Sequence, residues 1–180
     1  MLYIVCALKP EAQAFIDKFK LKKESLKEFK LFSNATLRLI VSGVGVERAR
    51  YATQTLIDSY DISDDDIYLN IGICGASQKY EIGELLQIFS LQYREEFYTF
   101  SKTATHTLTC LDVEATCNTH SIVDMESFGF YDAISHSPAI KQFYIFKVVS
   151  DHFEPHKVTK DKTKSLIFNV IDAINLLDLN

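Results

Sequence analysis

The sequence predicts a three-layer α/β domain in which a mixed central sheet is flanked by helices on both faces. Apolar runs rich in β-branched and aromatic residues alternate along the chain with segments of helical periodicity. The apolar runs are mostly continuous, which is typical of strands covered on both faces in a mainly parallel sheet. At 180 residues the chain is expected to form a single domain, residues 1–180.

The first segments of the chain indicate a strand, a helix and two further strands. Leu2–Leu8 is an apolar run that predicts the first strand. Pro10 then falls where the first helical turn would start, a position where the missing N–H removes no hydrogen bond, and a helix is expected to follow over Glu11–Lys20. Phe29–Ser33 and Thr36–Ser42 follow as a hairpin or two successive strands.

A second helix and a central strand come next. Helical periodicity covers Val46–Tyr60, and the apolar run Ile67–Ile73 predicts a buried strand. The acidic connector between them, Asp61–Asp66, is assigned to the surface because charged runs are usually solvated. The basic run Lys20–Lys30 is interpreted as the solvated side of a helix.

The second half of the chain continues this alternation of strands and helices. The further strands are expected over Glu84–Gln92, Thr105–Val113, Ser121–Met125 and Gln142–Val149. The further helices are expected over Ser127–Ile134 and, near the C-terminus, roughly Lys160–Leu177. In such sheets, ligands bind outside the carboxyl ends of the strands.

Charge and hydropathy exclude two classes of partner. The formal net charge is -5, and the basic residues are scattered, whereas nucleic-acid binding concentrates positive charge on one face. The apolar segment after Met1 spans only seven residues, too few for a membrane span or a signal peptide. We therefore expect neither nucleic acid nor membrane as a partner.

The cysteines indicate a reduced, cytoplasmic protein. Cys6, Cys74 and Cys110 lie in apolar strand-like runs, where a thiol behaves as a small buried hydrophobe. With Cys117 they include no CxxC pair.

Common cofactor and metal motifs are incomplete. Gly43 and Gly45 lack the third glycine of a dinucleotide fingerprint, and the glycine segment NIGICGA is not followed by the Gly-Lys-Ser/Thr of a phosphate loop. The histidines lack metal spacing except His152 and His156, between which Pro155 disfavours a shared helix. No GxSxG nucleophile motif is present. We expect no cofactor and no metal.

Carboxylates follow three predicted strands that are distant in sequence. Glu11 comes just after the first strand, Glu126 ends the strand in SIVDMESFGFYDAI, and Asp151 ends the strand in FYIFKVVSD. Each has a structural alternative, since acidic residues are common in first helical turns and at helix caps. If the strand ends share one edge, the three side chains could meet there.

The order of these segments resembles the nucleoside phosphorylase and nucleosidase superfamily, most closely the methylthioadenosine/S-adenosylhomocysteine nucleosidases. The matching segments span Ile4 to His152. In order, they are IVCALKPEAQAF, VSGVGVERA, NIGICGA, VDMESFG and KVVSDH. Each is short, but five in the same order with the expected strand context make a fairly specific signal.

The resemblance implies a role for each matched residue. Glu11 would position and deprotonate the attacking water, and Asp151 would act on the purine at N7. Met125 would pack against the sugar, and Glu126 would accept hydrogen bonds from its 2' and 3' hydroxyls. Gly72 and Ile73 of the NIGICGA segment would also bind substrate. Such residues suit N-glycosidic cleavage, which needs an acid, a base and negative charge near an oxocarbenium-like sugar.

Two departures from the family pattern keep alternatives open. The interval Ser77–Asp124 is shorter than in the family, and Ile73 stands where relatives often carry a small hydroxyl residue.

The leading functional prediction is an N-ribosyl hydrolase of a purine or 5'-modified nucleoside, because the phosphate-binding arginines of related phosphorylases are absent. A phosphorylase and a catalytically impaired nucleoside-binding homologue are the alternatives. The resemblance also implies a homo-oligomer, most simply a dimer.

Overall fold

The computed structural model describes residues 1–100 and 106–176. The first half contains five strands and two helices. Its strands are β1 (Leu2–Cys6), β2 (Lys22–Leu26), β3 (Phe29–Ser33), β4 (Leu37–Val41) and β5 (Ile67–Ala76). Its helices are α1 (Lys9–Phe19) and α2 (Val46–Ser59).

The second half contributes the remaining described elements. Its strands are β6 (Leu85–Ile88), β7 (Ser90–Tyr93), β8 (Glu96–Thr99), β9 (Thr107–Cys110), β10 (Ile122–Asp124) and β11 (Gln142–Asp151). Its helices are α3 (Ser127–Ser135), the short 3₁₀ helix η1 (Pro155–Lys157) and α4 (Lys160–Leu176). Thr105 and Leu177, at the ends of two predicted elements, lie outside the described residues.

A mixed sheet forms the middle layer, as predicted. Its strand order is β2-β3-β4-β1-β5-β10-β9-β7-β8, and β11 joins β5 to β6. Strands β1, β4 and β11 run parallel to their neighbours in the centre, whereas β2, β3 and β6 pair antiparallel. The long strand β5 therefore has β1 and then β10 along one side and β11 along the other.

Part of this sheet closes on itself. Strands β6 and β7 are separated only by Phe89, yet β6 pairs with β11 and β7 pairs with β9. Because β11 and β10 both pair with β5, the path through β9, β7 and β6 returns to its start. The sequence predicted one strand over Glu84–Gln92, which was wrong because the change of partner at Phe89 divides it.

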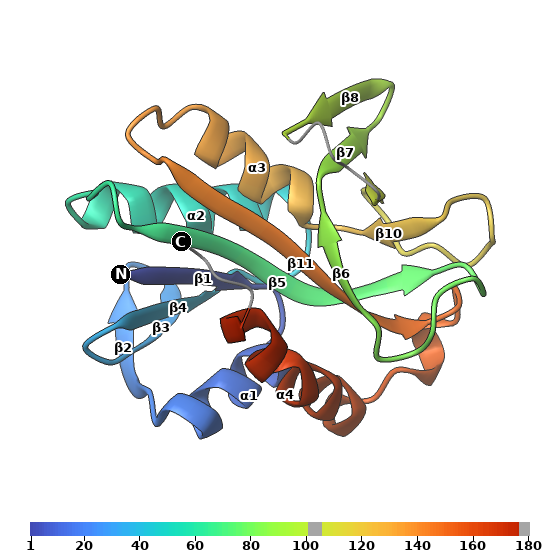
Figure 1. Ribbon diagram of the computed structural model, residues 1–180, viewed down its shortest axis with the longest axis horizontal. Coiled ribbons are helices and arrows are strands. Elements are labelled where there is room, and N and C mark those ends of the chain that lie inside the picture. Colours follow the sequence, from blue (N-terminus) through green and yellow to red (C-terminus); the bar gives the residue numbers. More distant parts are fainter. Residues whose placement is uncertain (101–105, 177–180) are drawn as a thin grey trace.

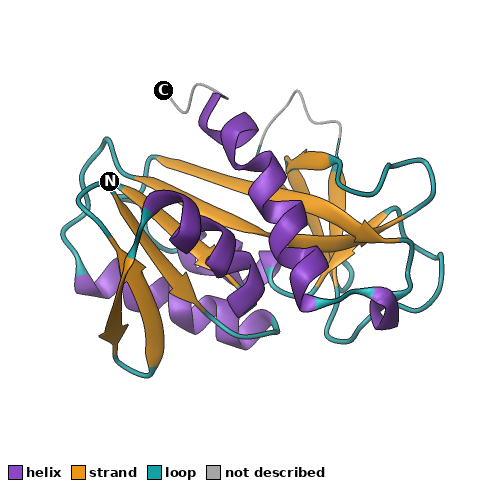
Figure 2. Cartoon of the chain, turned by 90° about the horizontal axis from the view of Figure 1, so that it is seen from below, coloured by secondary structure: helices purple, strands orange, loops and turns teal. Residues whose placement is uncertain are grey.

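Helices cover the sheet on both faces. Helices α2 and α3 lie on one face of the sheet and α1 and α4 on the other. In Figure 1 the first pair lies above the central strands and the second pair below them. Figure 2 shows α1 and α4 lying across the second face. Alternate residues of β1 enter the two cores: Tyr3 and Val5 on the α2 side, Ile4 and Cys6 on the α1 side. This alternation is how one apolar run supplies both layers.

Two surface predictions need correction. The basic run Lys20–Lys30 is not the side of a helix: most of it forms the hairpin of β2 and β3, with Lys27 in the left-handed region at φ 53°. Strand β2 is an exposed edge, where lysines discourage further strand pairing. In the acidic connector, Asp66 is buried, and its Oδ2 accepts a hydrogen bond from the Ser63 N–H.

Two further features are the exposure of the cysteine thiols and the length and hydropathy of the helices. Cys6, Cys74 and Cys110 are buried, Cys117 is exposed, and all of them are unpaired. Among residues 1–100 and 106–176, no helix is both long enough and apolar enough to cross a membrane.

Helices α2 and α3 approach closely at Gly129. A Cβ added to Gly129 would lie 2.0 Å from the Val46 carbonyl oxygen and 2.9 Å from the Arg50 nitrogen. Glycine inside a helix normally costs about 1 kcal/mol relative to alanine. Its presence here is explained by the contact between the two helix backbones.

Gly129→Ala should therefore destabilise the protein, against the usual gain in helix propensity. Overpacking of this kind typically costs ~1–3 kcal/mol. Urea denaturation would measure it, with Asn169→Ala on the exposed side of α4 as a control that should be neutral or slightly stabilising. A stabilised Gly129→Ala protein would show that the helices do not meet as described.

Candidate active site

A cavity of about 140 Å³ lies at the carboxyl ends of β1, β5 and β11, beside the turn from β10 into α3. This is the edge where α/β sheets bind ligands. The structure brings most of the predicted site residues into its lining: Glu11, Ile73, Met125, Glu126 and Asp151. Gly72 lies behind the lining, against the Glu11 side chain.

Glu11 is held by backbone amides from two elements. It is the third residue of α1, and its Oε2 accepts from the Leu8 N–H at 2.8 Å, which closes the start of the helix. Its Oε1 accepts from the Ile73 N–H of β5 at 2.9 Å. Burial raises the pKa of Glu11, although these amides and Lys147 act to lower it. The carboxylate is therefore both fixed in place and a stronger base than an exposed glutamate.

Gly72 makes this position of Glu11 possible. A Cβ at Gly72 would lie 2.9 Å from Glu11 Oε1, closer than real Cβ contacts. The glycine therefore lets the carboxylate lie directly on the backbone of β5.

Glu126 joins the starts of two helices. It directly precedes α3, and its Oε1 accepts from the Gly45 N–H at 2.9 Å. Gly45 directly precedes α2 and has φ 105°, a conformation that favours glycine. Burial, with the nearby charge of Asp124, raises the pKa of Glu126 to about 7, and Lys147 opposes the shift. Met125 lies beside it in the lining, partly buried.

Asp151 is turned into the cavity by a bulge in β11. The pairing register with β5 shifts between Val149 and Asp151, so the strand continues two residues beyond its predicted end. Asp151 Oδ1 accepts from the Glu154 N–H at 2.8 Å, and Oδ2 lies 2.7 Å from Ser150 Oγ. Ser150 Oγ is also 3.0 Å from the Cys74 carbonyl oxygen. One hydroxyl proton therefore faces two acceptors.

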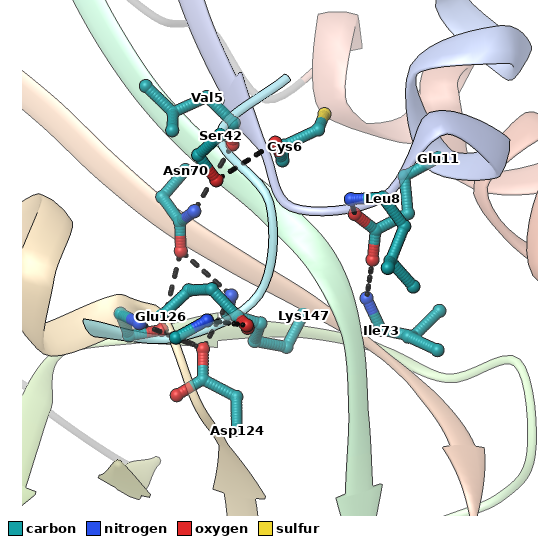
Figure 3. Close-up of polar contacts among 12 residues, drawn as sticks. Val5, Cys6, Leu8, Glu11, Ser42, Asn70, Ile73, Asp124, Glu126 and Lys147 are labelled. Atoms are coloured by element: carbon teal, nitrogen blue, oxygen red, sulfur yellow. Dashed lines mark hydrogen bonds and ion pairs between the residues drawn. The ribbon is translucent and has the colours of Figure 1, made fainter. Parts of the chain in front are cut away.

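A buried polar network lies beneath the carboxylates and was not predicted from the sequence (Figure 3). Lys147 Nζ is 2.8 Å from Asp124 Oδ2 and donates to Asn70 Oδ1 at 2.8 Å. The Ser127 hydroxyl donates to the same Asp124 oxygen at 2.5 Å, and Asn70 Nδ2 donates to the Val5 carbonyl. The available signal was a single lysine and a single asparagine in otherwise apolar strand segments.

The remaining lining is apolar or acidic. It includes Val44, Leu111, Val113, Val123 and Pro155, with Glu114 at one side. No arginine or lysine is among the lining residues. Within residues 1–100 and 106–176, no group of three or more His, Cys, Asp or Glu side chains is arranged to hold a metal ion.

Comparison with known proteins identifies the fold. No family model and no curated protein matches the sequence. Solved structures do match: *Arabidopsis thaliana* 5'-methylthioadenosine nucleosidase has a TM-score of 0.76 at 17% identity, with 99% of this chain and 97% of that chain covered. The *Neisseria meningitidis* 5'-methylthioadenosine/S-adenosylhomocysteine nucleosidase, in complex with methylthio-immucillin-A, has a TM-score of 0.75 at 12% identity, with 96% and 98% covered.

A further match extends the range of chemistry found on this fold. Futalosine hydrolase of *Helicobacter pylori* has a TM-score of 0.75 at 12% identity, with 96% of this chain and 97% of that chain covered. The chain thus has the α/β fold of the nucleoside phosphorylase and nucleosidase structures, as predicted. Similarity at this level of identity establishes the fold.

The raised pKa of Glu126 makes stability depend on pH in a defined direction. Its pKa is about 7 in the folded protein against an ordinary value of 4.5, so folding favours the protonated form. Its stabilising contribution is complete below about pH 4.5 and is lost as the pH rises through about 7. At ~1.4 kcal/mol per pKa unit, the loss is at most of order 3 kcal/mol.

The measurement is the free energy of urea unfolding between pH 5 and pH 8, for the parent protein and Glu126→Gln. The glutamine keeps an acceptor for the Gly45 N–H but cannot ionise, so its stability should fall less over this interval. If the free energy of unfolding fell equally with pH in the two proteins, the raised pKa would not belong to Glu126.

Proposed function

We propose that this protein is an N-ribosyl hydrolase that cleaves the glycosidic bond of a purine nucleoside or of a 5'-modified purine nucleoside. The observation that carries the proposal is the meeting of Glu11, Glu126 and Asp151 in one cavity at the carboxyl edge of the sheet. The fold, shared with the nucleosidases above, supports it. Each of the three carboxylates has a separate task in the proposed reaction.

Glu126 and Met125 would bind the sugar. One oxygen of Glu126 is already occupied by the Gly45 N–H, which fixes the side chain and leaves the other oxygen for ribose hydroxyls. An unpaired buried carboxylate is costly, so hydroxyl donors that enter the cavity gain strong, charge-assisted hydrogen bonds. Met125 supplies an apolar contact for the sugar ring from the same turn.

Glu11 would act as the general base. Water attacks the anomeric carbon as the bond to the purine nitrogen breaks, and the electron pair of that bond passes to the leaving purine. Glu11 takes the proton of the attacking water. Its burial raises its pKa and so favours proton uptake, and its two backbone hydrogen bonds hold it in one position.

Asp151 would deliver a proton to N7 of the leaving purine. Ser150 can donate its proton either to Asp151 or to the Cys74 carbonyl. When it donates to the carbonyl, Asp151 Oδ2 can itself carry a proton and share it with Ser150 Oγ. Asp151 and Ser150 can therefore hold the proton for N7 beside the cavity before the purine leaves.

Water is favoured over phosphate as the acceptor. A phosphorylase must hold an anion, usually with arginine or lysine. The lining contains neither, and Lys147 beneath it is committed to Asp124 and Asn70. Carboxylates of the cavity that are ionised would repel phosphate but not water.

We further propose that the protein works in the cytoplasm as a homodimer. The unpaired thiols agree with a reducing compartment. Val44 and Val113, both in the cavity lining, are exposed by 49% and 71%, and a second copy that covered them would shield the cavity from solvent. Size-exclusion chromatography with light scattering tests the dimer.

The purified protein should release free base from a nucleoside without phosphate. We would incubate it with adenosine, inosine, methylthioadenosine, S-adenosylhomocysteine and futalosine, with and without phosphate, and separate the products by chromatography. Loss of acid or base catalysis typically lowers the rate by ~10²–10⁴-fold, which is the loss expected in Glu11→Gln and Asp151→Asn. Asp58→Asn, on the exposed face of α2, is the control and should be unaffected.

Three results would contradict this proposal. A requirement for phosphate, with ribose 1-phosphate as product, would identify a phosphorylase. Calorimetric binding of a nucleoside without turnover would identify a binding protein. Full activity of Asp151→Asn would remove its assignment as the acid.

Gly72→Ala should lower kcat more than it changes KM, because a methyl group at this position displaces Glu11 from Ile73 without entering the sugar site. Steady-state kinetics would measure both values. Ile71→Val on the same strand is the matched control: it creates a small cavity in the core, at a typical cost of ~1 kcal/mol, without approaching Glu11. Equal kinetic effects in the two variants would show that lost stability, not displaced Glu11, is the cause.

A further inference from the structure

One fully buried lysine lies among the carboxylates of the site. Lys147 is 1% exposed and Asp124 is 7% exposed, and their charged groups are 2.8 Å apart. A lone buried charge is very unfavourable, and Asp124 is the main group that raises the pKa of Lys147 against the effect of burial. Strands β11 and β10 carry them, on opposite sides of the central strand β5.

The pair is fixed from several directions. Asn70 on β5 accepts from Lys147, and Ser127 at the start of α3 donates both its N–H and its hydroxyl to Asp124 Oδ2. All of these hydrogen bonds to Asp124 fall on one oxygen. Its Oδ1 is buried and has no hydrogen-bond partner among the described residues, and the nearby Cys110 thiol has its pKa raised by burial and by Asp124.

The pair lies next to Glu126. Asp124 is two residues before Glu126 and also lines the cavity, and Figure 3 shows Lys147 beside both carboxylates. The charged groups that act on Glu126 are Asp124 from β10, Lys147 from β11 and Glu11 from α1. Asp124 and Glu11 disfavour its negative charge, whereas Lys147 and the Gly45 N–H favour it.

We propose that Asp124 and Lys147 are positioning residues that together set the charge state of Glu126, and so decide when the sugar site can accept hydroxyl groups. This inference rests on the proposed function for its meaning in catalysis. Lys147 does not line the cavity, so it acts through Glu126 rather than on the substrate. Asp124 holds the lysine 2.8 Å from its own carboxylate and disfavours the negative charge of Glu126.

Substitutions of Lys147 and of Asp124 should therefore shift the titration midpoint of Glu126 in opposite directions. Removing the positive charge with Lys147→Gln leaves two negative neighbours, so Glu126 should ionise at higher pH. Removing the negative charge with Asp124→Asn frees Lys147 to pair with Glu126, which should then ionise at lower pH. A neighbouring charge typically moves a pKa by about 1–3 units, so each midpoint should move by about one pH unit or more.

The first measurement needs no activity. Carbon-13 carboxyl NMR would follow the titration of Glu126 in the ligand-free protein, with Glu126→Gln to assign its signal. Lys164→Gln and Asp58→Asn, which remove exposed or half-exposed charges far from the cavity, should leave the midpoint in place. Where one single variant does not fold, the other tests the inference alone by the direction of its shift. The double variant Asp124→Asn/Lys147→Gln removes both buried charges together, and its midpoint should lie between those of the two single changes.

The second measurement is the pH profile of kcat/KM, whose acidic limb should move with the NMR midpoint. A purely structural role would lower activity at every pH without moving the limb. Midpoints that stay within a few tenths of a unit in the single variants would overturn the inference even in an active enzyme. Opposite shifts in a protein that releases no base would support the charge pair and contradict the proposed function alone.

Discussion

The buried ion pair between Lys147 and Asp124 is the interaction on which the candidate site depends. Several carboxylates converge at the edge of a sheet, and burial raises the pKa of Glu11 and of Glu126. Lys147 is the buried cation among them and interacts electrostatically with Glu11, Asp124 and Glu126. Its positive charge opposes the effect of burial on the pKa of Glu11 and of Glu126, and so favours their ionised forms.

Hydrogen bonds from backbone amides fix the orientation of the carboxylates that line the cavity. Glu11 is held by amides of Leu8 and Ile73, Glu126 by that of Gly45 and Asp151 by that of Glu154. These amides are present with any residue except proline at those positions. The fold therefore needs only a few residue types to place three carboxylates, chiefly glycines at positions such as 45 and 72.

The sequence was sufficient where a signal is local or periodic. Apolar runs and helical periodicity located β1, α1, α2, β5, α3 and α4 closely, and the rule that ligands bind at carboxyl strand ends indicated where three distant carboxylates meet. It failed where pairing decides the structure. Strand β2 has no apolar alternation and exists because it pairs with β3, and β8 likewise depends on β7. The Asp124–Lys147 contact was also missed, since no local pattern reports which buried polar residues lie opposite each other.

A fold does not imply a function, so in the proposed reaction the side chains of the cavity decide which nucleophile completes the cleavage. An anion needs compensating positive charge, and the cation in this region is already neutralised by Asp124. Water needs only a fixed base, which Glu11 supplies. Because Lys147 is paired with Asp124 and no arginine or lysine lines the cavity, the described residues of the site offer no free positive charge to phosphate. In the proposed reaction, this charge balance favours water as the nucleophile.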